Sequence, residues 1–166
     1  MKFFHRNDLK PSRDWHFLKE GLEQNIKAHK EYDAHLEKIS SMLPEETKLF
    51  VLSSWYQNPK SHDCPHDAWL QELKVTAKTE NEEDRVVNVT MKLLGNCHDR
   101  ILTFEYVNVI DLNFDMKKCG RHNVGDWLSD EFDLADEGFI SHEILWQFGK
   151  PWRIVAKNIK FFAENK

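Results

Sequence analysis

The segment from Leu73 to Leu93, LKVTAKTENEEDRVVNVTMKL, decides the fold class of this chain. On both sides of the charged stretch 81–84, apolar and polar residues alternate with a period of two, which is the pattern of a half-buried β-strand. Two such strands joined by a short polar turn predict an antiparallel hairpin. Near residue 68 the periodicity therefore changes to that of strands, and the hairpin opens this second part of the chain.

The residues after the hairpin predict four more strands. A long run over 101–114 is expected to bend or bulge midway. Three further strands are expected at 127–134, 139–148 and 152–162, because turns rich in Gly, Asp and Pro separate these segments. Consecutive strands joined by tight turns pair antiparallel, so we expect a curved six-stranded antiparallel sheet.

Two helices are expected before the sheet. Apolar residues recur at spacings of mostly three and four, which predicts an amphipathic helix over about 13–41 with Ser12 as its candidate N-cap. Pro44, followed by two glutamates, predicts the start of a second helix that should end by Pro59. The apolar residues of 49–56 form a broad surface, which we expect to be largely buried.

Length and composition agree with one domain. The 166 residues lie within the usual domain size, and folding at this length buries about 70% of the unfolded surface. We therefore predict a single α+β domain over 1–166, with a helical part at about 12–57 and an antiparallel sheet at about 68–163. The two N-terminal helices are expected to pack on one face of the sheet.

Charge and cysteine content argue against several classes of protein. The chain has 23 basic and 28 acidic residues, a formal net charge of −5, which disfavours nucleic acid as a partner. Three cysteines make a disulfide framework improbable and favour a reducing compartment. Only Phe3 and Phe4 are apolar where a secretory signal needs roughly 7–15 apolar residues, and no segment approaches the roughly 18 of a membrane span. We expect a cytoplasmic protein without a membrane partner.

No established catalytic motif is present, because GxGxxG, GxxxxGK[ST] and GxSxG are all absent. His-Asp pairs occur at 62–63, 66–67 and 98–99, as in metal-dependent HD phosphohydrolases, but those enzymes carry their ligands on a largely helical domain. Here the pairs fall in loops around predicted strands. Cys64 with its neighbouring histidines could form a nucleophile and base, yet groups so close along one short loop rarely do so. We expect no catalytic residue.

Each cysteine has a histidine close beside it. Thiolates and imidazoles suit zinc, although the CxxC and HExxH spacings of strong zinc motifs are missing. Loops 58–67 and 96–99 flank the same edge of the predicted hairpin, so their side chains can meet. Ordinary turn chemistry explains the same residue types more simply, and a zinc site is the alternative interpretation. The candidate ligands are His62, Cys64, His66, Cys97 and His98, with Cys119 and His122 as a further pair.

A stretch of acidic residues offers a candidate binding surface. Between residues 126 and 137 the chain has six acidic residues and no basic one, which should produce a local negative field. A solvated strand face has the same composition, but such a surface can also dock a basic partner, with two aromatic side chains as anchors. The candidate interface residues are Asp126, Trp127, Asp130, Glu131, Phe132, Asp133, Asp136 and Glu137.

Four segments carry a resemblance to known proteins. SMLPEETKLF, HDAWLQELKV, LTFEYVNVIDLNF and DWLSDEFDLADEGFISHEILWQFGKPWRIVAKNIKFF resemble small uncharacterised bacterial proteins built as two helices followed by an antiparallel meander, over about 42–162. Some proteins of this kind lie beside polymorphic toxins and are taken to be immunity proteins. The resemblance implies a cytoplasmic bacterial module that binds a protein partner, namely a basic toxin domain, without catalysis or a cofactor. A metal-binding or hydrolytic protein centred on the histidines and cysteines is the alternative.

Overall fold

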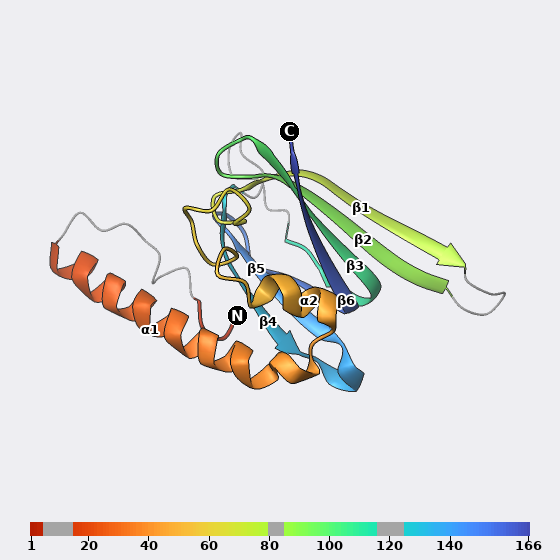
Figure 1. Cartoon of the computed structure of the whole chain (residues 1–166), viewed down its shortest axis with the longest axis horizontal. Coiled ribbons are helices and arrows are strands. Elements are labelled where there is room, and N and C mark those ends of the chain that lie inside the picture. Colours follow the sequence, from red (N-terminus) through yellow and green to blue (C-terminus); the bar gives the residue numbers. More distant parts are fainter. Residues whose placement is uncertain (5–14, 80–84, 116–124) are drawn as a thin grey trace.

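A computed structural model describes residues 1–4, 15–79, 85–115 and 125–166, the side chains of 15–22 excepted. Figure 1 shows two N-terminal helices lying against a twisted six-stranded antiparallel sheet that stays open. The predicted α+β class is confirmed. No helix in the described part of the chain is long and apolar enough to cross a membrane.

The sheet is built from two antiparallel meanders. Its strands are β1 (Trp69–Thr79), β2 (Arg85–Leu94), β3 (Arg100–Asn113), β4 (Trp127–Leu134), β5 (Ile140–Trp146) and β6 (Trp152–Asn165). Their order is β1-β2-β3-β6-β5-β4, and every neighbouring pair is antiparallel. Each meander joins three strands that are consecutive in sequence, and the last strands of the two meanders pair with each other. The sequence predicts the pairing of consecutive strands but not this return of β6 to β3.

The β3–β6 ladder is the longest in the sheet. It runs from Arg100 opposite Asn165 to Asn113 opposite Arg153, and both strands contain 14 residues. The register shifts after Val109, which confirms the irregularity predicted near the middle of this strand. Because β3 and β6 each belong to a different meander, this ladder holds the two halves of the sheet together.

The helical elements contact different parts of the sheet. They are α1 (Trp15–Ile39), the 3₁₀ turn η2 (Ser40–Met42) and α2 (Glu45–Val51), and a further 3₁₀ turn, η3 (Asp136–Gly138), separates β4 from β5. Helix α1 lies on β4, at one edge of the sheet, and α2 lies on β6 (Figure 1). The proposed N-cap, Ser12, falls outside the described residues.

One hydrophobic core joins the helices to both meanders. The ring of Phe50 in α2 lies with its centroid 6.1 Å from that of Phe104, 5.7 Å from that of Phe132 and 5.6 Å from that of Phe161. These three rings belong to β3, β4 and β6. On the α1 side, Leu36 is buried in the same core. The two helices are therefore needed to close the apolar face of the sheet.

The burial of Leu36 makes a measurable prediction about α1. Replacing Leu36 by Ala should lower the free energy of unfolding by about 2–5 kcal/mol, because the change leaves a cavity in the core. Replacing the exposed Lys38 by Ala should change it by less than about 0.5 kcal/mol. Urea unfolding measures both. Equally small effects at the two positions would show that α1 does not pack on the sheet in this way.

Candidate functional site

The acidic stretch 126–137 lies largely in the core. Trp127 and Phe132 are 0% exposed, and Asp130 and Glu131 are each 5% exposed. These four side chains therefore contribute almost nothing to the outer surface: Trp127 and Asp130 line a cavity of about 180 Å³, and Glu131 lines another of about 350 Å³. The remaining members of the stretch keep some exposure: Asp126, Asp133, Asp136 and Glu137.

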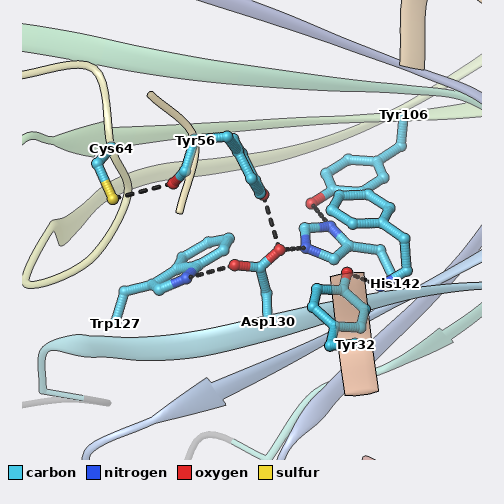
Figure 2. A network of polar contacts seen from close by, with 8 residues as sticks. Tyr32, Tyr56, Cys64, Tyr106, Trp127, Asp130 and His142 are labelled. Carbon is cyan, nitrogen blue, oxygen red and sulfur yellow. Dashed lines mark hydrogen bonds and ion pairs between the residues drawn. The ribbon is translucent and has the colours of Figure 1, made fainter. Parts of the chain in front are cut away.

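Asp130 is the centre of a buried polar network, which Figure 2 shows. Its Oδ2 atom accepts a hydrogen bond from Tyr56 Oη at 2.7 Å and lies 3.1 Å from Nε2 of His142. Its Oδ1 atom accepts a hydrogen bond from Nε1 of Trp127 at 3.2 Å. On the far side, Nδ1 of His142 lies 2.8 Å from Tyr106 Oη. One carboxylate therefore connects the segment after α2 with β3, β4 and β5.

Burial also fixes the protonation of the tyrosines around this network. Desolvation, followed by the negative charge of Asp130, raises the pKa of Tyr32, Tyr56 and Tyr106 well above the usual 10.0. Their hydroxyl groups therefore remain protonated at physiological pH. The Asp130–His142 pair resembles a catalytic dyad, but His142 is 0% exposed and Asp130 is only 5% exposed. We assign the network a structural role.

Glu131 binds the main chain of the first residues of the protein. Its carboxylate accepts hydrogen bonds from the main-chain N–H groups of Lys2, Phe3 and Phe4, at 2.6, 2.7 and 2.6 Å. The first residues of the chain are thus tied to β4, and Phe4 is buried in the core. No pattern in the sequence indicates this contact. The sequence around an acidic residue in a strand looks the same whether its carboxylate is solvated or binds main-chain N–H groups.

A cavity of about 180 Å³ lies beside the Asp130 network and is lined in part by His29, Cys64 and His66. Cys64 is buried, its Sγ donates a hydrogen bond to the Tyr56 carbonyl oxygen at 3.0 Å, and burial raises the pKa of its thiol to about 11. Burial also lowers the pKa of His29. A buried thiol with a raised pKa is a poor nucleophile, and Cys64 is not among the residues whose ligand atoms the structure brings together.

Loops 58–67 and 96–99 do meet, with a different set of side chains from the one expected. One ligand atom from each of His62, Cys97 and Asp99 lies within 4.8 Å of the others, and all three residues are exposed. Nδ1 of His62 lies 2.6 Å from Oδ2 of Asp99. Asp99 is not in the sequence-based set, because a carboxylate in a turn commonly accepts main-chain hydrogen bonds and so does not by itself indicate a metal site.

The other candidate ligands lie apart from this cluster. Nδ1 of His66 lies 3.2 Å from Oδ2 of its neighbour Asp67. The ring of His98 contacts Trp69, with the two centroids 4.4 Å apart. Cys119 and His122 fall outside the described residues. Of the five candidate ligands in loops 58–67 and 96–99, the structure therefore brings together only His62 and Cys97.

An apolar groove lies between α2 and β6. Leu49 is 74% exposed and Leu52 is 43% exposed, whereas Phe50, Val51 and Tyr56 are buried, so the apolar surface of 49–56 is buried only in part. Phe162 of β6 is 45% exposed. The groove encloses about 370 Å³. Exposed apolar side chains that gather on neighbouring elements mark an interaction site more often than isolated ones do. This β6 groove is lined by Glu46, Leu49, Phe50, Trp55, Lys160, Phe161 and Phe162.

The β6 groove lies along a free edge of β6. The ladder with β5 ends at Ala156, and beyond it Thr47 Oγ1 lies 2.9 Å from the Ile159 carbonyl oxygen and 3.1 Å from the Ile159 nitrogen. Alternate residues of a strand direct their main-chain groups to the same side, so those of Phe161 and Ala163 also face this edge. Within the described part of the chain, no residue outside β3 hydrogen-bonds to these two.

No family model, curated protein or solved structure matches this chain. Its function must therefore be argued from the geometry of these sites.

The Asp130 network predicts a large loss of stability when its centre is removed. Asp130→Ala should lower the free energy of unfolding by about 3–5 kcal/mol, because the buried partners Tyr56, Trp127 and His142 lose their acceptor. The matched control is Asp136→Ala on the exposed turn η3, which should change it by less than about 0.5 kcal/mol. Chemical denaturation compares the two. A loss below about 1 kcal/mol for Asp130→Ala would contradict the central role of this carboxylate.

The raised pKa of Cys64 predicts selective thiol labelling. At pH 8 only about one Cys64 thiol in a thousand is ionised, since its pKa is about 11, and burial further limits access. In a Cys119→Ser background, iodoacetamide should therefore modify the exposed Cys97 and leave Cys64 intact. Mass spectrometry of the peptides gives the result, and labelling in denaturant is the control. Equal rates for the folded protein would contradict the burial of Cys64.

Proposed function

We propose that this protein is a non-catalytic module that binds another protein, and that the β6 groove is its binding site. The observation that carries the proposal is the free edge of β6 beside an apolar groove of about 370 Å³. An extended segment of a partner can add to such an edge as a further strand. Main-chain hydrogen bonds to Phe161 and Ala163 would supply affinity, and an apolar side chain in the groove would supply specificity.

The residues around the groove suit this task. Trp55, Leu49 and Phe162 provide large apolar contacts, and aromatic side chains are enriched among the residues that dominate binding energy. An ion pair between Lys160 Nζ and Glu46 Oε1, 2.9 Å apart, stands beside them. Its hydrogen bond lowers the pKa of Glu46 and raises that of Lys160, so both groups are charged at neutral pH. An apolar centre with a charged border is the usual arrangement of a protein interface.

The alternative of catalysis has weaker support. The pair that most resembles an acid–base dyad, Asp130 and His142, is buried, and the Cys64 thiol is protonated. By contrast, the β6 groove is open to solvent and ready to receive a chain. A binding function therefore agrees better with what is accessible on this molecule.

The partner class follows from the resemblance to immunity-type proteins. On that basis we propose that the partner is a bacterial toxin domain, which this protein neutralises in the cytoplasm by occupying one of its surfaces. The formal net charge of −5, together with exposed Asp136 and Glu137, favours a basic partner, because opposite charges speed encounter. Buried Asp130 and Glu131 take no part in this contact.

Two substitutions test the β6 groove by different means. Leu49→Glu places a charge in the groove and should weaken binding to the product of the gene next to its own by at least about tenfold, or about 1.4 kcal/mol. Ala163→Pro removes the outward main-chain donor, and proline is tolerated where a strand edge faces solvent. It should weaken binding to a similar extent while the fold persists. Titration calorimetry and a thermal melt measure the two properties.

The matched control for these variants is Ile110→Glu. Ile110 is also exposed, at 59%, but it lies at the register shift of β3 and outside the groove. This variant should bind as the unchanged protein does, and only the unchanged protein and the control should protect cells that express the toxin. If Leu49→Glu and Ala163→Pro fold and bind normally, the β6 groove is not the interface. If the unchanged protein binds no neighbouring gene product, the immunity-type function is wrong.

A further inference from the structure

We propose that His62, Cys97 and Asp99 form a zinc site that joins loop 58–67 to loop 96–99. The three side chains offer an imidazole nitrogen, a thiolate and a carboxylate oxygen, with the ligand atoms within 4.8 Å of one another. Zinc bonds of about 2.0–2.3 Å place tetrahedral ligands about 3.3–3.8 Å apart. Because the side chains are exposed, small rotations reach that spacing. This inference is independent of the proposed protein-binding function.

The main chain around the cluster is already fixed by contacts between the two loops. Nδ2 of Asn96 donates a hydrogen bond to the Pro59 carbonyl oxygen at 2.9 Å. A Cβ atom at Gly95 would lie 3.3 Å from the His62 carbonyl oxygen, so the loops pack closely there. His98 has a φ of 59°, a left-handed conformation that turns the chain between Cys97 and Asp99. A metal would therefore bind to ligands whose backbones need little ordering.

The ligand chemistry selects a borderline transition metal. Magnesium and calcium prefer sites made of oxygen atoms, whereas sulfur with imidazole favours zinc. A hydrogen bond from His62 lowers the pKa of Asp99, so its carboxylate is ionised at neutral pH. Zinc binds thiolate, imidazole and carboxylate groups in their deprotonated forms, so its affinity for such a ligand set falls in acid.

Three protein ligands leave a fourth position to water. The site is open in this respect, unlike a structural site with four protein ligands. Its place in the fold indicates what it would do: the Asp99 carbonyl oxygen accepts a hydrogen bond from the Lys166 nitrogen at 2.9 Å, next to the end of the β3–β6 ladder. Zinc at this point would tie both loops to that end of the sheet and raise the melting temperature.

The test uses the full chain, freed of metal with a chelator and titrated with zinc chloride alone. We expect one zinc ion per chain and a rise in melting temperature. Cobalt(II) in place of zinc should give a thiolate-to-metal charge-transfer absorption, which reports direct binding by a cysteine. Cys97→Ser should abolish this absorption. His62→Gln and Asp99→Asn should each weaken zinc binding by more than about tenfold, because even outer-shell partners contribute about 10–100-fold.

Controls separate this site from other thiols and histidines. Cys64→Ser, Cys119→Ser and His66→Gln should leave the cobalt absorption and the zinc affinity unchanged. Metal-free Asp99→Asn should melt as the metal-free unchanged protein does, which separates loss of a ligand from loss of the fold. The proposal is overturned if zinc binding does not saturate, if the cobalt absorption survives in Cys97→Ser, or if it disappears in Cys119→Ser instead.

Discussion

The pairing of β3 with β6 is the constraint on which the rest of this structure depends. In the described part of the chain it is the only ladder between the two meanders, which are otherwise linked by an isolated bridge between Trp69 and Asp126, and it uses nearly the whole length of both strands. Because β5 covers β6 only as far as Ala156, the remainder of β6 has a second edge that the sheet cannot satisfy. An open sheet with uneven strands must either cover such edges or present them to a partner.

The helices cover the free edges of this sheet as well as its core. On β4, the Tyr32 hydroxyl accepts a hydrogen bond from the Phe132 nitrogen at 2.7 Å, so α1 satisfies part of an outer edge. On β6, the Thr47 hydroxyl of α2 donates a hydrogen bond to the Ile159 carbonyl oxygen and accepts one from the Ile159 nitrogen. Beyond Ile159, side chains of α2 pack beside β6, but in the described part of the chain no main-chain or hydroxyl group outside β3 pairs with Phe161 and Ala163. The β6 groove is thus the place where the covering of the sheet stops, which is why apolar side chains remain exposed there.

The sequence predicts local structure here much better than it predicts burial. Turn residues mark where a strand begins and ends, so the bounds of β4 were predicted correctly at both ends. The neighbour of β6 depends on contacts distant in sequence, which no local pattern encodes. In the same way, the helical pattern shows that Leu49 lies on an apolar surface but not how far the sheet extends beneath it. Exposure is decided by the partner element rather than by the residue.

The sequence predicted the meeting of loops 58–67 and 96–99, but it did not predict the burial of the acidic stretch 126–137. The difference lies in whether the partners of each residue can be inferred from local pairing. A carboxylate can be buried where donors converge on it, as three main-chain N–H groups do on Glu131, and those donors come from the other end of the chain. Charge composition therefore could not separate a solvated acidic strand from a buried one. The meeting of loops 58–67 and 96–99 was accessible, because hairpin pairing places Trp69 opposite Leu94 and so brings together the residues just outside the two strands. The register of a hairpin therefore predicts which residues lie close together across it, whereas the charge composition of a segment does not predict whether its side chains are buried.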